Sequence, residues 1–183
     1  MMKKICLAIF AAVLLLAGCQ SSPQTATTDK AFDGPDQEGW NSKVTVTSTG
    51  RIAAIVQYGH MAKYSKDRRV LFDDGVVVDF YGKKGEHSSK LTSARGILHE
   101  NSNDVEALGN VVVVSDSGTT LRTEKLRWLN QREKIVSEEF VTITTAKGDT
   151  LHGHGFESDA TMRQWSIRKL SGVSKKKVNL PNR

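Results

Sequence analysis

The sequence contains little cysteine, little proline and no long apolar run. Its 183 residues include two cysteines and three prolines. Two cysteines exclude a disulfide-rich scaffold and a four-cysteine zinc site. The longest apolar run, residues 5–17, has 13 residues, whereas a membrane-spanning helix needs about 20. That run is therefore a processing signal or a core helix, and not a membrane span.

Sequence patterns of common active sites are also missing. The chain has no P-loop, no Gly-x-Ser-x-Gly elbow and no His-Glu-x-x-His helix. The adjacent carboxyl pairs 73–74 and 138–139 point to opposite faces of a strand, so neither pair forms an acid/base dyad. His152 and His154 share a strand face, but no third metal ligand accompanies them. We therefore expect no enzyme activity, no metal and no cofactor.

The N-terminus has the pattern of a bacterial lipoprotein signal. A basic start at residues 1–4 precedes an apolar stretch, and Leu16-Ala17-Gly18-Cys19 then forms a lipobox. The alternatives are an ordinary signal with a chance cysteine, or a short buried helix. The pattern predicts that residues 1–18 are a signal peptide and that Cys19 is lipidated. Acyl chains on Cys19 would anchor the protein to a membrane, facing an extracytoplasmic space.

Composition divides the remainder into three parts. Residues 19–39 are rich in Ser, Thr, Gln, Pro and Gly and are expected to form a lipidated flexible linker. Residues 40–173 are expected to form the folded domain, and residues 174–183 a basic C-terminal tail. The net charge is +6, but the tail lacks interleaved aromatic residues for base stacking, and we expect no nucleic-acid binding.

The domain is predicted to be all-β. Short runs rich in Val, Ile, Thr, Phe and Tyr alternate with turn residues, and no stretch of helical length repeats every 3.6 residues. The predicted strands are 44–47, 51–58, 62–65, 70–72, 76–81, 88–99, 105–107, 111–115, 119–129, 135–136, 141–145, 151–156 and 162–169. Strands at this spacing predict a sandwich or a barrel-like fold.

An internal repeat predicts how the strands stack on one another. Residues 62–78, 94–113 and 124–143 each read as strand, polar turn, strand, short corner and strand, and a fourth copy begins at Gly155. A unit that cannot bury its own apolar face must stack on its neighbours. The expected product is a stack of hairpins folded into two facing sheets, with an unpaired edge strand at each end.

The motifs of this repeat resemble the LptC family of lipopolysaccharide-export proteins. The resemblance lies in residues 118–128, 135–143 and 148–156 together with Trp165, and it covers roughly residues 50–169. It implies an open β-jellyroll, a twisted two-sheet sandwich like that of LptA, LptC and LptD. Members of the family are often anchored by one N-terminal helix, whereas this chain carries a lipobox.

The resemblance implies a function in lipopolysaccharide transport. The protein would receive lipopolysaccharide from an inner-membrane ABC transporter of the LptB/LptF/LptG kind and pass it to an LptA-like bridge in the periplasm. Partners would dock at the sheet edges, with strand 51–58 facing the transporter and strand 162–169 facing the bridge. Function favours the inner membrane as the anchoring membrane. The alternative is a periplasmic or surface β-sandwich lipoprotein with a structural or glycan-binding role.

Alternation along the repeated strands predicts which side chains face inward. Apolar residues occupy the same alternating positions in the three aligned copies. The positions between them include the more polar residues in two of the three copies. The residues expected to line an acyl-chain cleft are Val76, Val78, Phe80, Val111, Val113, Leu126, Trp128, Val141, Ile143, Phe156, Trp165 and Ile167.

Overall fold

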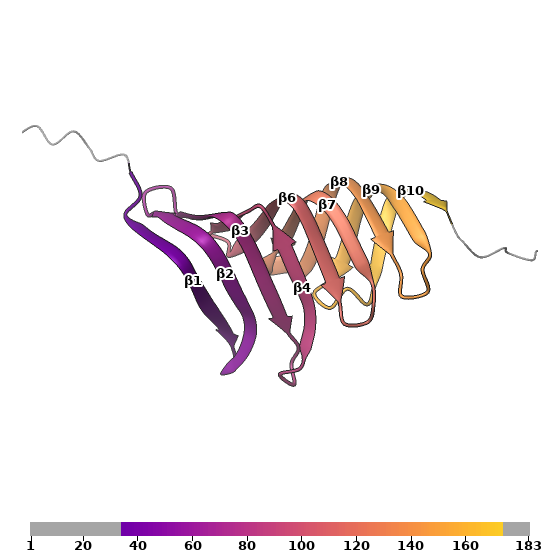
Figure 1. The fold of residues 1–183 in the computed structure, drawn as a ribbon, viewed down its shortest axis with the longest axis horizontal. Helices are drawn as coiled ribbons and strands as arrows, with labels where there is room; N and C mark the ends of the chain where they lie inside the picture. Colours follow the sequence, from indigo (N-terminus) through magenta and orange to yellow (C-terminus); the bar gives the residue numbers. More distant parts are fainter. Residues whose placement is uncertain (1–33, 174–183) are drawn as a thin grey trace, which may run out of the picture. The chain divides into compact units, whose positions relative to one another are not determined.

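The computed structural model of the protein describes residues 34–173 (Figure 1). The predicted signal peptide, Cys19 and the basic tail lie outside the described residues. The first strand begins at Gln37, inside the segment 19–39 that was expected to be a linker.

The described residues form ten β-strands and one turn of 3₁₀ helix, Asn130–Arg132. The strands are β1 (Gln37–Ser48), β2 (Arg51–Tyr64), β3 (Arg69–Tyr81), β4 (His87–Ser93), β5 (Arg95–His99), β6 (Asp104–Ser115), β7 (Thr120–Leu129), β8 (Lys134–Thr144), β9 (Thr150–Asp159) and β10 (Trp165–Val173). The all-β prediction is confirmed.

All ten strands belong to one antiparallel sheet, and its main path is β1-β2-β3-β4-β6-β7-β8-β9-β10. Strands β4 and β5 together occupy one position, because each pairs with a different half of β3 and of β6. The sheet folds over on itself, so its two halves face each other as the layers of a jellyroll (Figure 1). The two expected sheets are therefore two halves of a single sheet.

A line of bulges makes the fold possible. Register shifts interrupt the pairing of β2 with β3, of β6 with β7 and of β8 with β9 near the middle of these strands. In β6 the bulge contains Gly109 at φ 76° and Asn110 at φ 48°, a left-handed conformation that glycine and asparagine tolerate best. Backbone bonds from Gly75 to Ala94 (3.2 Å) and from Ala94 to Gly109 (2.9 Å) join neighbouring corners.

Several predicted strand boundaries are wrong at these corners. The breaks predicted at 73–75 and at 109–110 lie inside the continuous strands β3 and β6, because a bulge bends a strand without ending its ladder. Conversely, the single strand predicted over 88–99 is interrupted at Ala94, where β4 ends and β5 begins in the other half of the sheet.

Buried hydroxyls replace ladder bonds where β7 and β8 bend. The Ser137 hydroxyl donates to the Lys125 carbonyl at 2.7 Å, and the Thr123 hydroxyl donates to the Phe140 carbonyl at 3.0 Å. Both side chains are buried. These bonds satisfy carbonyls that the register shift leaves without a strand partner.

The hydrophobic core lies between the two halves of the sheet. Leu91, Val111, Val113, Leu121, Val141 and Ile143 from one half pack with Ala107, Leu126 and Phe156 from the other. Met162 completes this cluster from the turn between β9 and β10, where only 2% of it is exposed. The strand predicted over 162–169 is thus wrong at its start, since β10 begins at Trp165 and Met162 closes the core from a turn.

Strands β1 and β10 are the two edges of the sheet. The predicted N-terminal edge, residues 51–58, was wrong because β1 pairs with β2 along its whole length and covers it.

Candidate functional site

The inner face of the sheet carries one unbroken row of aliphatic side chains. Directly paired residues on neighbouring strands share a face of the sheet. Following the pairing from β1 to β9 gives a row in which every member is Val, Leu or Ile, and we call it the aliphatic ladder: Val44, Val56, Val78, Leu91, Val113, Leu121, Ile143 and Leu151. At β10 the row ends at Gly172. With strands about 4.8 Å apart, its eight members span about 34 Å.

Burial along the aliphatic ladder is greatest in the middle. Val113, Leu121 and Ile143 are between 0% and 2% exposed, because Ala107, Leu126 and Phe156 of the facing half cover them. Val44 at the β1 end is 45% exposed, as is its inner-face neighbour Val46. The ladder therefore runs from an uncovered end at β1 into a closed core.

The residues predicted to face inward lie on this inner face. Val76, Val111, Val113, Leu126, Val141, Ile143 and Phe156 are buried. Val78, Phe80, Trp165 and Ile167 are partly buried and pack against the core. Trp128 is partly buried and pairs with Val105 and Ile135. The inward phase is clearest in β8, where Ile143 is fully buried and Thr142 bonds to His152 on the outer face.

Three central residues of this face were not predicted. Leu91 and Leu121 each have polar residues on both sides and at the positions two residues away, and Met162 lies in a turn. A single apolar residue gives no alternation, so only the register with Val113 identifies Leu91 and Leu121 as parts of the inner face.

The histidine pair of β9 has a packing role on the outer face. The His152 ring stacks on Phe140 at a centroid distance of 5.8 Å, and the His154 ring meets Phe140 edge-on at 5.3 Å. Within residues 34–173, no three His, Cys, Asp or Glu side chains are grouped closely enough to hold a metal ion.

The outer face also carries a charged cluster across β5, β6 and β7. Glu106, which is 13% exposed, contacts Lys125 at 2.6 Å, His99 at 3.2 Å and Arg127 at 3.5 Å. Burial by itself disfavours the carboxylate, but the bond from Lys125 and the other cations outweigh burial and hold the pKa of Glu106 below its ordinary value. These contacts link β5, β6 and β7 on the face of the sheet that is turned away from the core.

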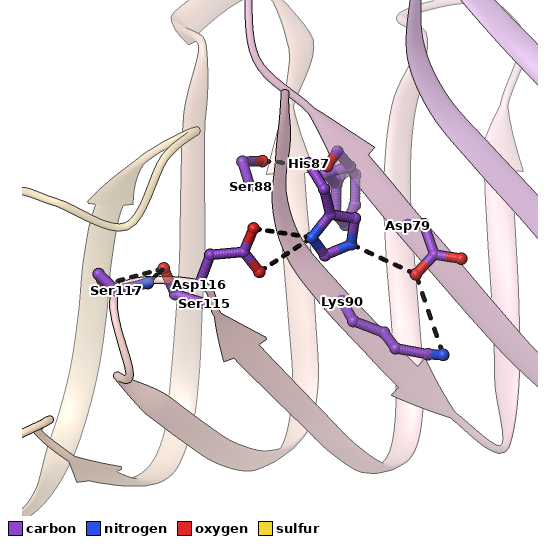
Figure 2. Close-up of polar contacts among 8 residues, drawn as sticks. Asp79, His87, Ser88, Lys90, Ser115, Asp116 and Ser117 are labelled. Atoms are coloured by element: carbon purple, nitrogen blue, oxygen red, sulfur yellow. Dashed lines mark hydrogen bonds and ion pairs between the residues drawn. The ribbon is translucent and has the colours of Figure 1, made fainter. Parts of the chain in front are cut away.

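Two other histidines join neighbouring strands through carboxylates. Figure 2 shows His87 between Asp116, at 2.9 Å, and Asp79, at 3.4 Å, with Lys90 on the other side of Asp79. His60 similarly lies between Asp73 at 2.8 Å and Glu38 of the edge strand β1 at 3.2 Å. The hydrogen bonds to Asp116 and to Asp73 raise the pKa of His87 and of His60, respectively.

These bonds predict a fold that is more stable in mild acid. A raised folded pKa means that the stabilisation is complete below the unfolded value, about 6.5, and is lost as pH rises through the folded value. We expect the unfolding temperature to fall as the pH rises above the unfolded value, and the double variant His60→Gln/His87→Gln to flatten that fall. Thermal denaturation followed by circular dichroism measures both slopes.

His154→Gln is the matched control, because His154 contacts the Phe140 ring and no carboxylate among the described residues. It should keep the wild-type slope. Equal slopes for the double variant and the wild type would contradict the assignment.

Comparison with known proteins gives a family match and similarity to solved structures, of which one is described here. A family model described as "Lipopolysaccharide-assembly, LptC-related" matches residues 5–169. LptH of Pseudomonas aeruginosa, the LptA-homologous periplasmic component of a lipopolysaccharide transport device, is similar in structure with a TM-score of 0.48 and 16% sequence identity. That alignment covers 70% of this chain and 89% of LptH. No curated protein sequence matches the chain.

Within residues 34–173 there is no helix of the length and hydropathy needed to cross a membrane.

Proposed function

Because this chain belongs to the LptC-related family of lipopolysaccharide-assembly proteins, we propose that its folded sheet is a conduit for the acyl chains of lipopolysaccharide. Its involvement in lipopolysaccharide transport follows from the family. In the proposed mechanism it receives lipopolysaccharide from an inner-membrane ABC transporter of the LptB/LptF/LptG kind and passes it to an LptA-like bridge in the periplasm. It catalyses no reaction in this transfer.

The aliphatic ladder is the observation that carries the proposal. Each methylene that leaves water contributes about 0.8 kcal/mol, so acyl chains need an apolar surface throughout their passage between membranes. At about 34 Å the ladder is longer than one bilayer leaflet, which is about half of a 30 Å hydrocarbon core. An acyl chain bound along the ladder would contact Val, Leu and Ile side chains from β1 to β9, while the sugars and phosphates of lipopolysaccharide remained in water.

The burial gradient supports a direction of transfer. The uncovered β1 end, with Val44 and Val46 each 45% exposed, suits the side that receives lipid from the transporter. Strand β10, at the other edge, suits the LptA-like bridge, since an unpaired edge can add a strand from a partner. Passage through the closed middle requires the two halves of the sheet to separate along the bulges.

Photo-crosslinking in living cells tests the conduit directly. A photoreactive residue at Val56, which lies on the aliphatic ladder and is partly buried, is expected to form an adduct with lipopolysaccharide. The neighbouring position Gln57 is exposed and paired with Val77 on the outer face, so the same probe there is the matched control. Adducts at Gln57 and none at Val56 would contradict transport along the inner face.

Anchoring by Cys19 is a separate part of the proposal. Diacylation forms a thioether with the cysteine sulfur, so Cys19→Ser is expected to block lipidation and to let the unprocessed precursor accumulate. Metabolic labelling with a fatty acid and the mobility of the protein on a denaturing gel measure the two effects. A variant that matures normally and still fractionates with membranes would overturn the lipobox interpretation.

A further inference from the structure

A cluster of exposed cations lies next to the uncovered end of the aliphatic ladder. The β1–β2 turn and the β3–β4 loop lie at the same end of the strands (Figure 1). They contact each other, because the Arg51 guanidinium donates to the Lys83 carbonyl at 3.5 Å. We call the exposed residues Arg51, Lys83 and Lys84 the cationic rim.

None of the three side chains of the cationic rim forms an ion pair within the described part of the chain. Glu86, in the same loop, accepts a bond from the Lys84 backbone amide at 3.0 Å. Two further carboxylates, Asp79 of β3 and Asp116 after β6, contact His87, and Asp79 also contacts Lys90 (Figure 2).

Most cations on the outer face of β7, β8 and β10 differ in this respect. Lys125 is paired with Glu106, Lys134 with Glu157 and Arg168 with Glu138. A neighbouring carboxylate offsets the field of a paired cation, so that such a pair attracts an anionic ligand less than an unpaired cation does. The cationic rim therefore differs from these three paired cations, and its position beside the uncovered end of the aliphatic ladder distinguishes it further.

The cationic rim adjoins apolar surface that is open to solvent. Val46 of β1 pairs with Ala54, and Ala54 pairs with Phe80, three residues before Lys83. Val46 is 45% exposed, and Ile52, next to Arg51, is 43% exposed. Free cations beside exposed aliphatic side chains match a ligand that joins anionic groups to hydrocarbon chains.

We propose that Arg51, Lys83 and Lys84 bind the phosphate groups of the lipopolysaccharide glycolipid while its acyl chains enter the inner face over Val44 and Val46. This inference rests on the proposed function and specifies where the substrate is first held. Phosphates bound at the rim would stay in water, and they would orient the acyl chains toward the aliphatic ladder.

The test compares two probes on the purified full chain: lipopolysaccharide and the same lipopolysaccharide after enzymatic removal of its phosphates. The variant Arg51→Glu/Lys83→Glu/Lys84→Glu reverses the cationic rim. Lys66→Glu/Lys147→Glu/Arg163→Glu is the control, since it changes the net charge equally at exposed turns elsewhere in the sheet. All chains are first checked for folding by circular dichroism.

We expect the wild type and the control to bind the phosphorylated probe about tenfold or more tightly than the dephosphorylated one, because each cation of the rim attracts the anionic phosphates. The rim variant should lose that preference and bind the dephosphorylated probe as the wild type does. Equal preference in the rim variant and the wild type would overturn the rim site. Failure of the wild type to bind either probe would instead overturn the proposed function.

Sedimentation with vesicles of phosphatidylglycerol separates a membrane role from a substrate role. If the rim variant loses vesicle binding but keeps its preference for phosphorylated lipopolysaccharide, the rim serves the membrane surface and the inference is wrong. Unchanged vesicle binding with a lost preference supports it.

Discussion

Replacing Ile143 by arginine is expected to destabilise the domain by more than about 4 kcal/mol. Ile143 is fully buried at the centre of the core, and it pairs with Leu121 and Leu151 on the aliphatic ladder. A guanidinium there would have no partner, and it would either remain unpaired in the core or force the two halves of the sheet apart. Chemical denaturation measures the change in the free energy of unfolding.

Thr142→Arg is the control one position away. Thr142 lies on the outer face and bonds to His152 at 3.0 Å, so its replacement should cost about 1 kcal/mol or less. Any fraction of the Ile143→Arg variant that folds is expected to lose lipopolysaccharide capture while keeping partner docking. A damaging Thr142→Arg beside a silent Ile143→Arg would mean that the inward phase of β8 is reversed.

Gly153→Val is expected to detach β10 from the sheet and to destabilise the domain by about 3 kcal/mol or more. Gly153 pairs with Leu170 of β10, and the two backbones approach closely there. A Cβ at this position would overlap the carbonyl oxygen of Lys169 and the Cγ2 atom of Ile167. Since one of these atoms belongs to the backbone, a rotamer change cannot relieve the overlap.

Hydrogen exchange measures this effect locally. Amides of β10 should lose protection in Gly153→Val, whereas those of β1 and β2 at the opposite edge should keep theirs. Binding of an LptA-like bridge should be lost with β10, and binding of the transporter at β1 should persist. His154→Val is the control, because His154 is exposed on the outer face. Undiminished protection of β10 in Gly153→Val would refute the close approach as the cause.

Much of the fold could be predicted from local patterns. Alternating apolar residues in 111–113 and 141–143 predicted strands and also their inward phase, because side chains on a strand point to opposite faces with a period of two. The turn residues between strands were also informative, because Gly, Asn and Asp favour the backbone conformations of turns. The corners of the fold were harder to predict. The Gly109-Asn110 pair suggests a turn, but the same two residue types also suit a bulge inside a continuous strand.

The candidate site was only partly predictable. Residues of the repeated strands, such as Val113 and Ile143, were found because they recur in the same phase. Leu91 and Leu121 were missed because the residues next to each of them, and those two positions away, are polar. The cationic rim was missed because Arg51 and Lys83 are 32 positions apart in the sequence.

Local sequence is enough to predict most of the strands, the period of their faces and the stacking of repeated hairpins, since each follows from neighbouring residues in an extended chain. The register between strands is known only from the folded sheet. Register is a relation between distant segments, and the pairing of Leu91 with Val113 and of Leu121 with Ile143 depends on where the bulges fall. That register joins isolated side chains into one apolar row, and the fold of the sheet buries its middle while leaving its β1 end open.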